Sequence, residues 1–148
     1  MKQEDKELLL RDLCARLPYG VKVLYQVGSQ IPDIKFFDGK QYEELKHGSI
    51  LDDWLKCTFK PYLFPLSSMT EEQFMELKVF ADLTYEGNTL ELVEWDDNYK
   101  TLEFWLEEIP SYHLIKVFDW LNKNHFDYRG LIEKSLALDA TNLGIYEL

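Results

Sequence analysis

The chain has few cysteines and no long hydrophobic run. Its two cysteines, Cys14 and Cys57, stand apart without a CxxC pair, which argues against a disulfide-dense secreted scaffold. We expect two buried thiols in a reducing compartment, with a disulfide between them as the alternative. No segment approaches about eighteen apolar residues, the length that spans a membrane. Residues 1–13 contain acidic residues where a secretory leader would have a basic stretch followed by an apolar run. A cytoplasmic protein without membrane association is therefore predicted.

Motifs for catalysis, cofactors and metals are missing as well. His47, His113 and His125 show no HxxxH or HExxH spacing, and residues 96–98 lack the alternation of a calcium loop. No serine stands in a GxSxG context, and no glycine-rich phosphate loop is present. The sequence thus predicts no catalytic residue, no cofactor and no metal site, and it favours binding over enzymatic activity.

Negative charge is concentrated in one segment. Residues 71–108 contain twelve Asp and Glu against two Lys, whereas residues 1–70 hold ten residues of each sign. This segment accounts for most of the formal net charge of -11. Because Lys and Arg drive binding to nucleic-acid phosphates, we expect no direct contact with nucleic acid. A basic protein surface is the predicted partner.

The composition predicts a folded single domain over residues 1–148. Hydrophobic residues make up 46% of the chain, which is too much for a disordered acidic tail, and the length suits one domain. Aromatic residues reach 15%, so some rings are expected at the surface or in a homo-oligomer interface.

The first half suggests a helix followed by strands. Residues 4–17 carry an apolar face at the i, i+3, i+4, i+7 spacing, formed by Leu10, Leu13, Cys14 and Leu17. Residues 21–27 and 34–37 have strand character, and Asp38-Gly39 suits a tight hairpin turn to a third strand at 41–45. A small antiparallel meander results, with a short helical turn at 49–55.

The second half alternates between helices and extended segments. Residues 60–70 contain Pro61 and Pro65, which are disfavoured in helices and central strands, so an extended connector is predicted. A capping box of Thr70 and Gln73 opens a helix to about residue 81. Helices are also expected at 111–123 and 131–138. The predicted fold class is α+β, with an antiparallel sheet or meander covered by three to four helices.

Residues 87–106 predict a hairpin with an acidic, tryptophan-containing outer face. Tryptophan is enriched at binding hot spots, so this face is the predicted partner-binding site. The alternative is a solvated surface that keeps the protein soluble. The predicted partner-binding residues are Glu91, Trp95, Asp96, Asp97, Glu103, Trp105 and Glu107.

A second candidate site lies in one short turn. His125, Asp127, Tyr128 and Arg129 combine an acid-base group, a carboxylate, a phenol and a guanidinium, which together could hold a phosphate or a polar substrate. In the structural alternative, Arg129 pairs with a carboxylate and the aromatic residues anchor the tail to the core.

Three segments resemble a family of small proteins encoded by bacteriophages and prophages of gut Bacteroidetes. They are residues 6–23 (KELLLRDLCARLPYGVKV), 60–72 (KPYLFPLSSMTEE) and 119–140 (DWLNKNHFDYRGLIEKSLALDA). The resemblance implies a phage-related, cytoplasmic origin. It implies no activity and no catalytic residue.

The predicted function is that of a small acidic accessory protein. Its acidic hairpin would bind a basic surface of another protein and so modulate or inhibit a nucleic-acid-binding host protein. One alternative is a nucleotide-binding or small-molecule-binding protein, or an enzyme, that uses the turn from His125 to Arg129. The other is a homo-oligomeric structural component.

Overall fold

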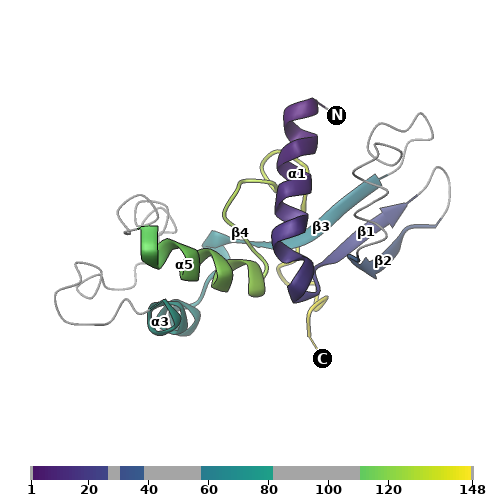
Figure 1. Cartoon of the computed structure of the whole chain (residues 1–148). Helices are drawn as coiled ribbons and strands as arrows, with labels where there is room; N and C mark the ends of the chain where they lie inside the picture. Colours follow the sequence, from purple (N-terminus) through teal and green to yellow (C-terminus); the bar gives the residue numbers. More distant parts are fainter. Residues whose placement is uncertain (1, 27–30, 39–57, 82–110, 148) are drawn as a thin grey trace. The chain divides into compact units, whose positions relative to one another are not determined.

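A computed structural model of the chain describes residues 2–26, 31–38, 58–81 and 111–147 (Figure 1). The chain divides into two compact units. The first unit comprises Met1–Leu63 with Arg129–Leu148, and the second comprises Phe64–Tyr128. Helices and a five-stranded sheet give the predicted α+β class. That the whole chain forms one domain stays a prediction.

Helix α1 (Gln3–Arg16) buries a different face from the predicted one. Cys14 and Leu17 are exposed, so the expectations of a buried Cys14 thiol and of an inward Leu17 are wrong. The buried face has the same i, i+3, i+4, i+7 spacing as the predicted one. Its residues are Leu9, Asp12, Leu13 and Arg16. Two of these four residues, Asp12 and Arg16, are charged and form an ion pair. A 3-10 turn, η1 (Leu17–Tyr19), follows and ends at Gly20.

Three antiparallel strands are neighbours in the order β2, β1, β3, and the last two residues of β3 belong to the second unit. They are β1 (Lys22–Gln26), β2 (Asp33–Phe36) and β3 (Thr58–Pro65). The register sets Leu24 opposite Ile34 on one side and Lys60 on the other. Strand β5 (Leu138–Asp139) then pairs with β3 in parallel. The predicted strands at 21–27 and 34–37 are confirmed, but the sheet is mixed because the returning C-terminal segment adds a parallel strand.

Strand β3 contains both prolines of the segment that was predicted to be a connector, so that prediction is wrong. Pro61 lies opposite Val23 in the pairing with β1. The Phe37 N–H donates to the Val21 oxygen at 2.8 Å, so Val21 and Val23 direct their backbone groups toward β2 in the alternation of an antiparallel ladder. Pro61 therefore faces a position of β1 that forms no hydrogen bond with β3, and no ladder bond is lost.

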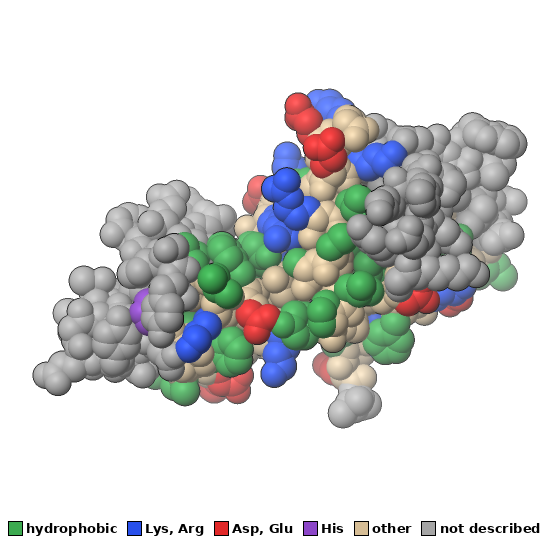
Figure 2. Space-filling model, viewed as in Figure 1, with side chains coloured by type: hydrophobic (Ala, Val, Ile, Leu, Met, Phe, Trp, Pro, Cys, Tyr) green, Lys and Arg blue, Asp and Glu red, His purple; other side chains and the backbone are tan. Residues whose placement is uncertain are grey.

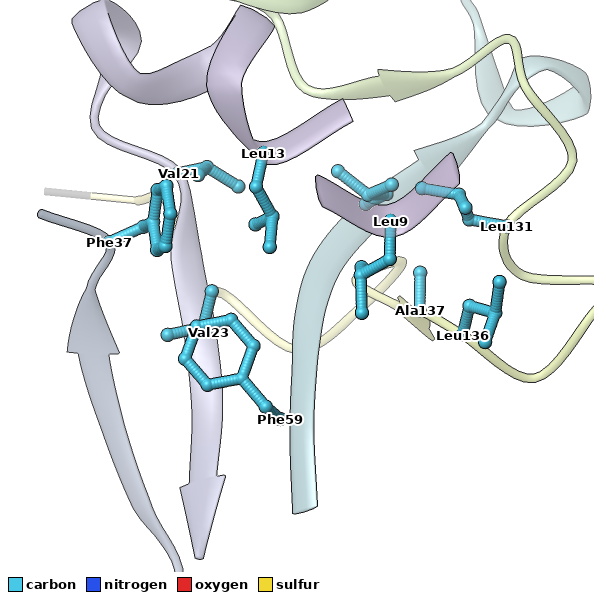
Figure 3. Packing of buried hydrophobic residues seen from close by; sticks show 10 residues of the cluster. Leu9, Leu13, Val21, Val23, Phe37, Phe59, Leu131, Leu136 and Ala137 are labelled. Carbon is cyan, nitrogen blue, oxygen red and sulfur yellow. The ribbon is translucent and has the colours of Figure 1, made fainter. Parts of the chain in front are cut away.

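The core of the first unit lies between α1 and one face of the sheet (Figure 3). In Figure 3, Leu9 and Leu13 of α1 point toward Val23 of β1 and Phe59 of β3, and toward Val21 just before β1. The remaining members come from the residue after β2, from β3 and from the C-terminal segment. They are Phe37, Leu63, Leu131, Leu136 and Ala137.

Residues 131–138 do not form the predicted helix. The N–H groups of Leu136 and Ala137 both donate to the Leu131 oxygen, at 2.9 Å and 3.2 Å. Ser135 adopts a positive φ of 59°, which ends the helical turn. This reversal places Leu131, Leu136 and Ala137 together in the core, so burial of three apolar side chains overrides the local helical pattern.

The second unit consists of the 3-10 turn η2 (Leu66–Ser68), helices α3 (Glu71–Phe80) and α5 (Ser111–Lys123), and strand β4 (Phe126–Asp127). Both helices confirm the predicted spans. β4 pairs in parallel with the end of β3. The core is apolar and aromatic, with the ring of Trp120 stacked on Phe126 at 5.7 Å. Its other members are Leu66, Met69, Phe74, Leu77, Ala81, Val117 and Leu121.

Several predicted elements lie outside the described residues. They are the strand at 41–45, the helical turn at 49–55 and the acidic hairpin at 87–106. Within the described part of the chain, no helix combines the length and the apolar character needed to cross a membrane.

Candidate protein-binding groove

Helix α3 begins at a capping box that fixes the position of its acidic first turn. Thr70 Oγ1 accepts a hydrogen bond from the Gln73 N–H at 3.2 Å, and Gln73 Oε1 accepts one from the Thr70 N–H at 2.9 Å. These bonds satisfy two N–H groups that a helix start otherwise leaves open. Glu71 and Glu72 follow in the first turn, where the positive end of the helix dipole favours carboxylates.

The two faces of α3 differ in what they contact. Phe74 and Leu77 are buried in the core of the second unit. The opposite side exposes 48% of Met75 and 65% of Val79, and Phe80 next to them is 40% exposed. An isolated exposed apolar residue is ordinary, but three within two helical turns form a patch.

Helix α5 supplies the second wall. The buried His113 ring joins the two helices, since its Nδ1 lies 2.9 Å from the Ala81 oxygen. Trp120 belongs to the core yet also lines the groove. The Asn124 amide donates to the Trp120 oxygen at 2.9 Å and so holds the end of the helix beside exposed Lys123.

An open groove of about 880 Å³ lies along these two helices. Its apolar lining comes from Met75, Val79, Phe80 and Trp120. Its polar lining comes from Glu71, Glu72 and Glu76 of α3, from Lys123 of α5 and from Asn124 just after α5. Over α3, Figure 2 shows acidic and apolar side chains beside one another at the surface. The groove therefore combines exposed apolar area with three carboxylates and one lysine.

A smaller hollow of about 600 Å³ adjoins the groove through Phe80. Ile115, which is 74% exposed, lines it with Phe118 and the polar residues Lys116, Asp119 and Asn122. The apolar surface of the second unit thus continues from α3 onto α5.

The residues of the predicted ligand-binding turn are held by other contacts. His125 and Asp127 are buried. Tyr128 donates to Asn122 Oδ1 at 3.0 Å and stacks on Phe118 at 4.9 Å. Arg129 belongs to the first unit, and its Nη1 lies 3.1 Å from Asp12 Oδ1. These are contacts of the kind that the structural alternative predicts, and a ligand site at this turn stays a prediction.

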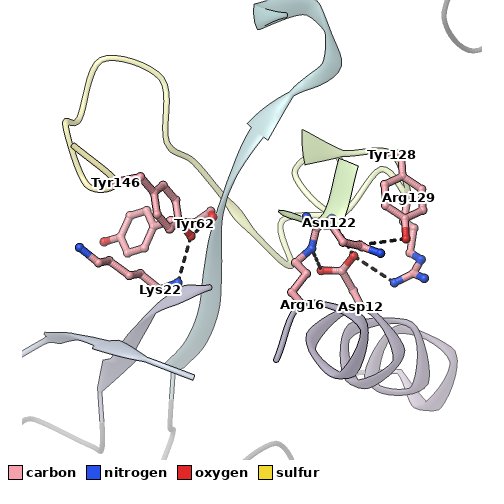
Figure 4. A network of polar contacts seen from close by, with 8 residues as sticks. All are labelled: Asp12, Arg16, Lys22, Tyr62, Asn122, Tyr128, Arg129 and Tyr146. Atoms are coloured by element: carbon pink, nitrogen blue, oxygen red, sulfur yellow. Dashed lines mark hydrogen bonds and ion pairs between the residues drawn. The ribbon is translucent and has the colours of Figure 1, made fainter. Parts of the chain in front are cut away.

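A buried charge cluster in the first unit was missed from the sequence. Asp12 Oδ2 accepts from Arg16 Nε at 2.7 Å, and Asp12 Oδ1 accepts from Arg16 Nη2 at 3.0 Å and from Arg129 Nη1 (Figure 4). Both Asp12 and Arg16 are fully buried. The sequence could have indicated this pair, because Asp12 and Arg16 are four residues apart and lie on the same helix face as Leu9 and Leu13.

Tyr146 joins the C-terminal segment to the sheet (Figure 4). Its hydroxyl accepts from the Lys22 N–H at 3.0 Å and donates to the Tyr62 oxygen at 2.7 Å. By register, Lys22 and Tyr62 would form the next pair of the ladder between β1 and β3, so the phenol replaces a direct backbone bond. Lys22 Nζ also donates to the Ile145 oxygen at 2.6 Å.

Burial raises the pKa of Tyr146 to about 12, because a phenolate is desolvated more unfavourably than the neutral phenol. The Lys22 N–H and the charge of Arg16 lower this pKa, and the charge of Asp12 raises it. The hydroxyl therefore stays protonated, as its donated bond to Tyr62 requires.

The predicted partner-binding residues lie outside the described part of the chain. They are Glu91, Trp95, Asp96, Asp97, Glu103, Trp105 and Glu107. Among the described residues, no group of three or more His, Cys, Asp or Glu side chains is arranged to hold a metal ion.

Comparisons with known proteins found no match among protein-family models, curated proteins or solved structures.

Proposed function

We propose that the protein acts by protein–protein binding and that the groove of α3 and α5 receives a basic amphipathic helix of its partner. The observation that carries this proposal is the combination of exposed Met75, Val79 and Phe80 with carboxylates along one groove. A partner helix that places apolar side chains on these residues would remove apolar area from water. The acidic lining would favour Lys or Arg beside that apolar stripe.

The arrangement of α3 supports a helical partner. Glu72, Met75, Glu76 and Val79 recur at i, i+3, i+4 and i+7, so they form one stripe along the helix. A second helix laid along such a stripe can place its own residues at the same spacing, which is how helices bind in grooves.

The acidic hairpin predicted for residues 87–106 remains part of this proposal as a second contact surface. It would bind a basic partner by the same charge complementarity, with Trp95 and Trp105 as apolar anchors. A phage-related accessory role, in which the partner is a nucleic-acid-binding host protein, also remains a proposal. It rests on the sequence resemblance and on the acidic charge.

The proposal can be tested with a fluorescein-labelled amphipathic helical peptide that contains only Leu, Ala and Lys. Fluorescence anisotropy is expected to show saturable binding that weakens as salt is added, because screening reduces attraction between exposed charges. A matched peptide with Glu in place of Lys is expected to bind at least about 10-fold more weakly.

Paired variants identify the surface that binds. Val79→Asn removes apolar area from the groove, and Leu143→Asn makes the same kind of change at an exposed residue of the first unit. Glu72→Lys with Glu76→Lys is compared with Glu91→Lys, Glu103→Lys and Glu107→Lys in the predicted hairpin. Weaker binding for the groove variants supports the groove. Equal binding for Val79→Asn and Leu143→Asn would exclude it.

A further inference from the structure

Strand β2 ends the strand order that the structure describes in the first unit. A second strand at its outer edge would take the place of the strand predicted at 41–45, which lies outside the described residues. Among the residues that the structure describes, β2 pairs with β1 and with no other strand. All four of its residues, Asp33–Phe36, are exposed, including 50% of Ile34 and 61% of Phe36. An exposed edge presents backbone N–H and C=O groups that another strand can bond.

The ladder with β1 shows which groups point outward. The hydrogen bond from the Phe37 N–H to the Val21 oxygen marks these residues as a hydrogen-bonded pair. Because hydrogen-bonded and non-hydrogen-bonded pairs alternate, Asp33 and Lys35 direct their backbone groups toward β1. The N–H and C=O of Ile34 therefore point away from β1, toward the open edge.

The side chains of β2 form a self-complementary pattern around Ile34. Asp33 and Lys35 lie on one face, where the Lys35 Nζ is 3.5 Å from the Asp33 carboxylate, and Ile34 and Phe36 lie on the other. An antiparallel copy centred on Ile34 sets Asp33 opposite Lys35 of the second copy, and Lys35 opposite Asp33 of the second copy. Ile34 then faces Ile34 of the second copy.

We propose that β2 pairs with β2 of a second copy of this chain around a two-fold axis at Ile34. In this register the two Ile34 residues exchange two backbone hydrogen bonds. Each Asp33 and Lys35 forms a non-hydrogen-bonded pair, the kind in which side chains approach most closely. Pro32 has no N–H, so it limits the new ladder to a few residues. A weak, reversible dimer is the expected product.

Charge variants test this register through sedimentation velocity over rising protein concentration. The wild type is expected to dimerise reversibly. Asp33→Lys places like charges opposite each other twice, and Lys35→Asp does the same with carboxylates. Each variant alone should associate about 10-fold more weakly than the wild type. Far-UV circular dichroism should stay unchanged, since both side chains are exposed.

The decisive experiment mixes the two variants. A chain with Asp33→Lys and a chain with Lys35→Asp restore opposite charges across the interface, although neither restores the pair within its own strand. Recovery of the dimer in the mixture supports the proposal. Both variants keep a net negative charge, so overall attraction cannot produce that recovery.

The control pair is Glu133→Lys and Lys134→Asp, which make the same charge changes at exposed positions of the first unit. These variants should dimerise like the wild type, separately and mixed. A wild type that stays monomeric at high concentration would overturn the proposal. So would single variants that dimerise as well as the wild type, or a mixture without recovery.

Discussion

Helices α1 and α3 are both amphipathic, but they place their charges on opposite sides. In the first unit, α1 turns Asp12 and Arg16 inward, where both are fully buried. In the second unit, α3 turns Glu71, Glu72 and Glu76 outward along a groove and exposes Met75 and Val79 beside them. In α1 the charged side chains form contacts inside the unit. In α3 the charged and apolar side chains lie together at the surface.

This contrast shows that neither the apolar nor the charged residues of a helix are enough to predict which of its faces is exposed. A buried ion pair is costly to desolvate, and it is retained only when its hydrogen bonds are well made. Asp12 meets this requirement with three hydrogen bonds from two arginines. The carboxylates of the α3 groove face solvent and need no such partners.

The largest expected effect comes from breaking the charge cluster of the first unit. Asp12→Ala removes the carboxylate that Arg16 and Arg129 both contact, and it leaves cationic side chains in a buried site. The free energy of unfolding is expected to fall by about 3–5 kcal/mol, measured by urea denaturation. Arg11→Ala, on the exposed side of the same helix, should change it by less than about 0.5 kcal/mol. Equal effects of the two substitutions would contradict a structural role for Asp12.

An intermediate effect is expected from alkaline pH in the first unit. Tyr146 has a folded-state pKa of about 12, above the ordinary value near 10. The unfolded chain therefore loses this proton first, and the stability that the protonated phenol contributes is complete below pH 10 and lost as pH rises through about 12. The loss amounts to about 2–3 kcal/mol.

Tyr146→Phe isolates this effect from the titration of other tyrosines and lysines. The stability difference between the wild type and Tyr146→Phe should shrink between pH 9 and pH 12, as followed by guanidinium unfolding at each pH. A difference that stays constant over this range would show that the phenol is not protected by burial.

The smallest expected effect tests the start of α3 in the second unit. Thr70→Ala removes the side-chain acceptor of the capping box, and the free energy of unfolding should fall by about 1 kcal/mol. Ser67→Ala, at an exposed position before the helix, serves as its control in thermal melts. If both variants melt at the same temperature, the cap does not stabilise α3.

Local signals in the sequence predicted the helices of the second unit well. Thr70 and Gln73 gave the start of α3, and the apolar spacing after Ser111 gave α5. The concentration of negative charge in residues 71–108, which include α3, was evident too. The groove itself was not predicted, because it depends on how α3 and α5 pack, and nothing local in the sequence shows that Trp120 and Met75 line one surface.

In the first unit, long-range packing overrode local patterns. The predicted buried face of α1 was wrong because the prediction counted only apolar residues and so left out Asp12 and Arg16. Their partner Arg129 lies far along the chain, so the neighbouring sequence did not indicate that this pair is buried. The two prolines of β3 also misled the prediction. Pro61 is tolerated because Val23, its neighbour in β1, directs its backbone N–H and C=O toward β2 and away from β3.

The division of the chain has a consequence for biosynthesis. The first unit is discontinuous, since its residues 1–63 need Arg129–Leu148 to supply β5, Tyr146 and three core side chains. The second unit is a single continuous stretch whose residues leave the ribosome earlier. Domains generally fold as units during synthesis. The second unit can therefore form its core from its own continuous stretch, whereas the first unit cannot complete its core before the last segment has been made.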